Sequence, residues 1–150
     1  MNPTHATRLL LEDHRTTLSD GMAAEVVMAV GARDITDGVF RHDPPSPVEL
    51  EQAIDRIEDA LAASGLRHAA RGELLIRDPR LCALLGLQAS GERRTCDEVE
   101  DMFGRLVSVS LGQPAALAGV AGAGDTAAAL LILRECMHHL GFDGVRYAAD

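Results

Sequence analysis

Residues 125–147 read DTAAALLILRECMHHLGFDGVRY and predict a buried helix followed by a short strand. The run AAALLIL is apolar on every face, which is typical of a helix enclosed by other elements. Asp125 is suited to cap the start of this helix, near residue 126, and Gly141 to end it. Residues 144–148 favour a closing strand. A buried helix that leads into a strand indicates an α/β fold.

A second well-marked segment, residues 40–50 (FRHDPPSPVEL), predicts the start of an amphipathic helix. Its prolines disfavour regular structure because proline has no N–H and restrains the residue before it. Ser46 and Glu49 form a capping box, and Pro47 takes the first helical position, where its missing donor costs nothing. The helix extends to Gly65. Its apolar stripe consists of Leu50, Ile54, Ile57 and Leu61.

Weaker patterns predict three further strands. Residues 7–11 (TRLLL) and 25–35 (EVVMAVGARDI) favour the two strands of a hairpin, with a turn at residues 19–21. Gly31 falls inside the second of these segments and indicates a bulge or bend. Residues 73–76 (ELLI) favour a short buried strand.

The remaining residues predict two more helices and a loop. Residues 81–87 favour a short helix, and Thr95 with Glu98 forms a second capping box that opens a longer one. Residues 112–124 are rich in glycine and alanine and favour a loop. Together these patterns predict a single α/β domain over residues 1–150, with a small mixed sheet and three or four helices.

Composition argues against nucleic-acid and membrane partners. The net charge is −9, all 14 basic residues are scattered arginines, and the aromatic residues are three Phe and one Tyr. Neither a basic stripe nor a stacking platform for bases is present in the sequence. The sequence has no apolar run of about 18 residues, so it predicts no membrane span. Residues 1–13 lack the pattern of a signal peptide. We expect a cytoplasmic protein.

The three cysteines fit that expectation. Cys82, Cys96 and Cys136 are odd in number and far apart, without the spacing of a zinc site. We predict reduced, buried thiols and neither a disulfide nor a metal site.

Three segments resemble, in order and spacing, the later part of the second domain in the exopolyphosphatase/guanosine pentaphosphatase family. They are GARDITDGVF at residues 31–40, PPSPVEL at residues 44–50 and ALLILRECMHHLG at residues 129–141. The resemblance extends over residues 31–147, with gaps. It implies half of an actin-like, sugar-kinase-like ATPase fold.

The phosphate-binding glycines of that family have no counterpart in the sequence. The resemblance places the triple-glycine loop upstream of Thr7, where six residues remain, and a second glycine turn at residues 77–82, which read RDPRLC. Phosphate loops need glycine so that backbone N–H groups can approach the anion. Proline has no N–H and aspartate repels phosphate. The family's first domain also has no counterpart, so we expect a degenerate half without phosphohydrolase activity.

These observations lead to three hypotheses of function. The first is a non-catalytic binding or regulatory homodimer, whose interface is the buried-helix region or an open sheet edge. The alternative is a phosphohydrolase that acts on polyphosphate or guanosine polyphosphates, with a site rebuilt at the dimer interface. The third is a subunit that folds with another protein. We expect no cofactor, and Mg²⁺ only if the phosphohydrolase alternative holds. The candidate phosphate contacts are Arg77, Arg80, Gly122, Gly124 and Asp125.

Other chemistry-bearing segments have simpler interpretations. GAGD at residues 122–125 resembles the anion hole of ribokinase-like kinases, but an Asp that caps a helix is the more frequent explanation. His138 and His139 point about 100° apart on a helix and cannot share one ion. Residues 12–14 (EDH) favour an exposed turn. Asp55 and Asp59 favour a solvated helix face rather than a catalytic pair.

Overall fold

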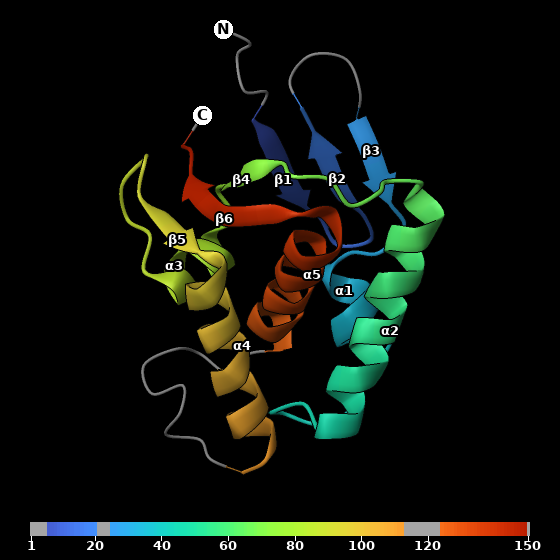
Figure 1. Cartoon of the computed structure of the whole chain (residues 1–150). Helices are drawn as coiled ribbons and strands as arrows, with labels where there is room; N and C mark the ends of the chain where they lie inside the picture. The colour runs from blue at the N-terminus through green and yellow to red at the C-terminus, as the bar shows by residue number, and fades with distance from the viewer. Residues whose placement is uncertain (1–5, 21–24, 113–123, 150) are drawn as a thin grey trace, which may run out of the picture.

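A computed structural model of the chain describes residues 6–20, 25–112 and 124–149, and these form one six-stranded mixed sheet with five helices (Figure 1). Their buried apolar side chains make one core cluster. The strands are β1 (Thr7–Leu11), β2 (Thr16–Ser19), β3 (Glu25–Met28), β4 (Gly72–Ile76), β5 (Arg93–Thr95) and β6 (Phe142–Tyr147). The helices are α1 (Ala32–Thr36), α2 (Pro47–Ser64), α3 (Pro79–Leu85), α4 (Cys96–Ser110) and α5 (Gly124–Leu140). The predicted α/β class with a mixed sheet is confirmed.

The sheet has the strand order β3-β2-β1-β4-β6-β5. β1, β2 and β3 form an antiparallel meander, whereas β1, β4 and β6 run parallel. Helices connect the parallel strands, as parallel pairing requires. β5 adds an antiparallel edge strand to β6.

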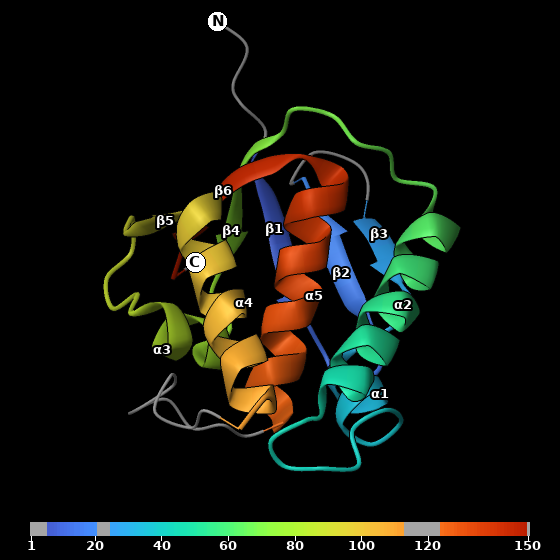
Figure 2. The ribbon, with the colours of Figure 1, turned by 60° about the horizontal axis from the view of Figure 1, so that its bottom comes forward.

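All five helices lie on one side of the sheet in the described part of the chain (Figures 1 and 2). α5 occupies the middle of this helical layer and contacts α1, α2, α3, α4 and β6. Leu9, Leu74 and Val145 are buried in the core beneath these helices. On the other side of the sheet, Leu10 and Val27 are 47% and 50% exposed. One face of the sheet is therefore packed and the other is bare among the described residues.

The predicted capping box at the start of α2 is present. The Ser46 hydroxyl oxygen accepts the Glu49 N–H at 3.2 Å, and Glu49 Oε1 accepts the Ser46 N–H at 2.9 Å. Glu49 Oε2 accepts the Arg41 N–H at 2.8 Å and lies 3.0 Å from His42 Nδ1. Gly65 ends the helix with a φ of 80°. The Glu49 carboxylate therefore holds the incoming loop to the helix as well as capping it.

Other predicted boundaries agree with the structure to within a few residues. The box of Thr95 and Glu98 opens α4. α3 begins at Pro79 rather than at residue 81, because the Asp78 side chain caps it. α5 begins at Gly124 and β6 at Phe142, each two residues earlier than predicted. Most of the predicted loop at residues 112–124 lies outside the described residues.

The predicted hairpin is wrong. β2 lies between β1 and β3 and pairs with both, so the two predicted strands are not neighbours. The sequence TTLS of β2 has little apolar character, so it gives only a weak strand signal. In the structure, the Thr16 hydroxyl donates a hydrogen bond to the Val30 carbonyl at 2.8 Å and so helps to hold this strand in place. Residue 21 of the predicted turn lies outside the described residues.

The predicted strand at residues 25–35 is also shorter than expected. β3 ends at Met28, and α1 follows with Gly31 as its N-cap. The Gly31 N–H donates to Asp34 Oδ2 at 2.8 Å, so local side-chain chemistry overrides the strand propensity. Gly31 is extended and forms no bulge. β5, only three residues long, was not predicted either.

Two further expectations concern cysteines and membranes. Cys82 and Cys136 are buried free thiols and Cys96 is a partly buried one. Within the described ranges, none of the helices combines the length and apolar character needed to cross a membrane.

We predict that Glu49 makes stability depend on pH in the acid range. Its pKa is lowered from 4.5 to about 2, chiefly by the Ser46 N–H; burial opposes this, and His42 and the Arg41 N–H add to it. A lowered folded-state pKa contributes stability above about pH 4.5 that is lost as the pH falls toward 2. Glu49→Gln should therefore destabilise the protein at pH 7, with a difference from wild type that shrinks between pH 4.5 and 2.

Urea unfolding of both proteins across this pH range measures the difference. Glu51→Gln, which changes an exposed carboxylate near the start of α2, serves as the control and should behave as wild type. A constant difference between wild type and Glu49→Gln would contradict the prediction.

Candidate functional site

The predicted phosphate contacts converge only in part, at the point where the end of β4 meets the start of α3. Asp78 and Arg80 form a bidentate ion pair here, with Nη2–Oδ2 at 2.9 Å and Nε–Oδ1 at 3.2 Å. The Asp78 side chain of this pair is largely buried. The guanidinium that an anion would need is therefore already bound to a carboxylate.

Further carboxylates surround Arg80. The Asp78 hydrogen bond raises the pKa of Arg80 most, burial lowers it, and the charges of Asp78, Asp125 and Asp13 raise it further. Three carboxylates thus act on one guanidinium. Carboxylates so placed disfavour the approach of a phosphate group.

The backbone donors at the start of α3 are also occupied. Asp78 Oδ1 accepts the N–H groups of Arg80 and Leu81 at 3.0 and 3.3 Å. Pro79 supplies no N–H. An anion therefore finds neither free backbone donors nor a free guanidinium at this helix start.

The other predicted contacts lie elsewhere. Arg77 faces the bare side of the sheet, where it lines a hollow with Leu10 and Leu75. Gly124 opens α5, and a Cβ built on it would lie 3.5 Å from Phe40 and 3.6 Å from Thr36. Gly122 lies outside the described residues. Among the described candidates, Arg80 lies near the start of α5, which holds Gly124 and Asp125, whereas Arg77 lies on the other face of the sheet.

The turn between β1 and β2, residues 12–15, packs against the start of α1. The carbonyls of Glu12 and Asp13 accept the Ala32 and Arg33 N–H groups at 3.1 and 2.8 Å. This turn is a packed structural seam that carries acidic side chains.

Gly31 is essential to that seam. A Cβ at this position would overlap the carbonyl oxygen of Glu12 and the carbonyl group of Asp13. The exposed turn predicted for residues 12–14 is present, with His14 Nδ1 at 3.0 Å from Asp34 Oδ1. Close backbone packing between this turn and the start of α1 is what the described residues show here.

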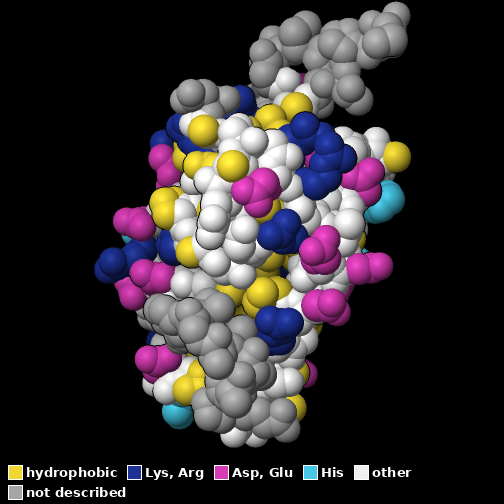
Figure 3. Space-filling model, turned by 90° about the vertical axis from the view of Figure 1, so that its left-hand side faces the viewer, with side chains coloured by type: hydrophobic (Ala, Val, Ile, Leu, Met, Phe, Trp, Pro, Cys, Tyr) yellow, Lys and Arg dark blue, Asp and Glu magenta, His cyan; other side chains and the backbone are white. Residues whose placement is uncertain are grey.

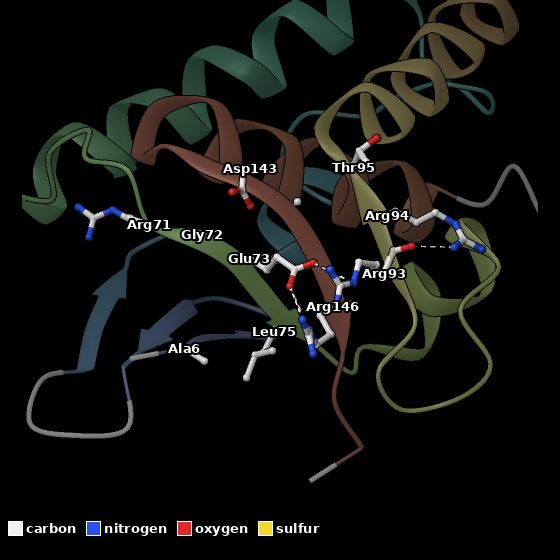
Figure 4. A pocket seen from close by; sticks show the side chains of 11 residues that line it. Ala6, Arg71, Gly72, Glu73, Leu75, Arg93, Arg94, Thr95, Asp143 and Arg146 are labelled. Carbon is white, nitrogen blue, oxygen red and sulfur yellow. Dashed lines mark hydrogen bonds and ion pairs between the residues drawn. The ribbon is translucent and has the colours of Figure 1, made fainter. Parts of the chain in front are cut away.

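A second candidate site lies on the bare face of the sheet. Two hollows of about 660 and 440 Å³ share Leu75 and extend over this face. In the larger one, Glu73 lies between the guanidinium groups of Arg93 and Arg146 (Figure 4). Arg146 Nη2 is 2.6 Å from Glu73 Oε1, and Arg93 Nε is 3.6 Å from Glu73 Oε2. Two arginines thus share one carboxylate in an open hollow.

Strand register arranges this face into rows. One row crosses all six strands, and its members are Glu25, Ser19, Arg8, Leu75, Arg146 and Arg93 in the order of the strands. A second row holds Val27, Thr17 and Leu10. The face therefore combines exposed apolar side chains with a row that has an acidic residue at one end and a basic residue at the other.

Sequence reasoning missed this face. Its signal is the alternation of outward residues in short strands, and β5 has too few residues to show it. Seen from the β5 side, basic and acidic side chains are interspersed over the described surface (Figure 3). The arginines that looked scattered in the sequence meet only through strand pairing.

No protein-family model and no curated protein matches this chain. Solved structures do. A Ppx/GppA phosphatase of Aquifex aeolicus matches with a TM-score of 0.72 and 11% identity, over 98% of this chain and 54% of that one. An exopolyphosphatase from Cytophaga hutchinsonii gives 0.71 and 10%, over 99% and 54%. An exopolyphosphatase-like protein gives 0.70 and 12%, over 97% and 55%.

The chain spans about half the length of these structures. At this level of identity the likeness establishes the fold, which is half of an actin-like ATPase arrangement. The partial resemblance to the exopolyphosphatase/guanosine pentaphosphatase family, predicted from three motifs, is confirmed in that structural sense.

We predict that Gly31→Ala destabilises the protein by at least about 1–3 kcal/mol, the usual cost of overpacking, because rigid backbone must move to admit the methyl group. Gly104→Ala in α4 is the matched control, since a Cβ there has no neighbour within 4 Å. Alanine should stabilise that helix by up to about 1 kcal/mol. Urea unfolding measures the stability of the two variants. Equal changes in the free energy of unfolding would contradict the close packing at Gly31.

Proposed function

We propose that the chain is a non-catalytic binding or regulatory protein that acts as a homodimer through the bare face of its sheet. The observation that carries the proposal is the pairing of Arg80 with Asp78 beside Asp13 and Asp125. This arrangement replaces an anion site with an acidic cluster. The likeness to exopolyphosphatases then concerns the scaffold and not the reaction.

The bare face supports the choice of interface. Leu10 and Val27 account for two of the four large apolar side chains that are exposed in the described residues. The buried-helix region offers no comparable surface, because α5 is enclosed by the other four helices and β6. Apolar side chains grouped on one face are characteristic of an interaction surface.

The charge row supports a second copy as the occupant. A twofold axis parallel to the strands, placed between Arg8 and Leu75, reverses the row in the partner. Glu25 of one protomer then faces Arg93 of the other, at both ends of the interface. Such self-complementarity is what an isologous dimer requires. Two sheets packed in this way lie about 10 Å apart.

The cysteine thiols indicate the cellular compartment in which the protein acts. Cys82, Cys96 and Cys136 are unpaired with one another, and two of them are buried. A reducing environment keeps such thiols free. We therefore propose a cytoplasmic location.

The first prediction is that phosphate compounds neither stabilise the protein nor are hydrolysed by it. A ligand at about 100 times its dissociation constant adds roughly 2.7 kcal/mol, a melting shift of about 5–10 °C here. Polyphosphate, guanosine tetraphosphate and ATP, each with and without Mg²⁺, should give no such shift and no phosphate release. A shift that disappears in Arg80→Ala would favour the phosphohydrolase alternative instead.

The second prediction concerns the dimer. Wild type should sediment as a dimer, and Glu25→Arg should shift it to monomer because Arg then faces Arg93 twice. The double variant Glu25→Arg with Arg93→Glu should restore the dimer. Analytical ultracentrifugation at several protein concentrations measures these states.

Glu51→Arg, which changes charge equally on the exposed side of α2, should leave the dimer intact. A monomeric wild type would overturn the dimer, and an unaffected Glu25→Arg variant would overturn this interface.

A further inference from the structure

A cluster of metal-ligating side chains lies in the helical layer, away from both sites described above. Glu58 of α2 meets Glu135 and His139 of α5, and one ligand atom of each lies within 4.8 Å of the others. His139 Nε2 is 2.8 Å from Glu58 Oε2 and 3.8 Å from Glu135 Oε1. Glu135 and His139 share one helix face because they are four residues apart.

Glu135 is unusual for its burial. It is 1% exposed, and it is the charged member of the group of largest fully buried side chains. Arg134 Nη1 is 3.1 Å from Glu135 Oε2. The other oxygen, Oε1, faces His139 beyond hydrogen-bond distance. A buried carboxylate thus directs one oxygen toward two further ligand atoms.

The geometry points to one divalent transition-metal ion bound by Glu58, Glu135 and His139. Zinc binds nitrogen and carboxylate oxygen at about 2.0–2.2 Å, which places neighbouring ligand atoms about 3.3 Å apart in a tetrahedral site. The separations of 2.8 and 3.8 Å lie on either side of that value. Small side-chain rotations of Glu58 and His139 would close the site.

Charge and second-shell contacts favour the same ion. The carboxylates of Glu135 and Glu100 face the guanidinium of Arg134, and that of Glu58 faces His139, so three carboxylates and one guanidinium lie around the site. Arg134 holds Glu135 and is itself held by Glu100, with Nε–Oε1 at 2.8 Å. Such outer partners orient ligands in metal sites.

Access and ligand number define the kind of site. The side chains of Glu58 and His139 are 40% and 38% exposed, so an ion can enter from solvent. Three protein ligands leave a fourth position for water. The ion would join α2 to α5 across 81 residues of sequence and so stabilise the helical layer.

Isothermal titration of the full chain with Zn²⁺ tests this site. We expect one ion per chain, a melting shift of about 5–10 °C near 100 times the dissociation constant, and loss of both on His139→Ala. Loss of an outer-shell partner weakens metal binding roughly 10–100-fold. Because Glu58 would be a direct ligand, Glu58→Gln should weaken Zn²⁺ binding by more than that. Both side chains are half-exposed, so these variants should fold, and circular dichroism checks that they do.

His138→Ala is the matched control. His138 is the exposed neighbour of His139 and lines a separate hollow with Cys96, so this variant should bind as wild type. Absence of Zn²⁺ binding by wild type would overturn the site. Equal loss in His138→Ala and His139→Ala, or full binding by Glu58→Gln, would overturn it as well.

Discussion

The burial of α5 is the constraint on which the rest of the structure depends. Its residues from Ala128 to Leu133 are at most 2% exposed, and four helices and β6 pack around them. At about 0.8 kcal/mol per buried CH₂, this helix supplies a large part of the driving force for folding. A helix with no polar face can be stable only if it is surrounded. The other helices therefore gather on one side of the sheet, and the opposite face stays bare in the described residues.

The same arrangement brings several carboxylates together at one edge of the sheet. In this fold the ends of β1 and β4 and the starts of α3 and α5 converge. Here the convergence is filled by carboxylates, one bound arginine and a turn whose carbonyls are hydrogen-bonded to α1. These groups satisfy one another and tighten the packing at Gly31. At this meeting point the carboxylates of Asp13, Asp78 and Asp125 outnumber the single guanidinium of Arg80.

Sequence reasoning succeeded where a signal is local and strong. Capping boxes at Ser46 and Thr95 and the uniform apolar run in α5 fixed three helices, because each signal resides within a few residues. β2, β5 and α1 have three to five residues each, too few for a periodic pattern to develop. Motif order was sufficient to indicate the family resemblance despite 10–12% identity in the matched structures.

The candidate sites were harder to predict because they are tertiary. The row that contains Arg8, Arg146 and Arg93 forms only through five strand pairings. His139 and Glu58 are 81 residues apart in the sequence. The sequence argument that His138 and His139 cannot share an ion considers only one helix. The structure adds Glu58 from α2 to His139 and leaves His138 facing α4. A pair of adjacent histidines at a helix end thus divides between two environments, and only the packing of neighbouring helices decides which one gains ligand partners.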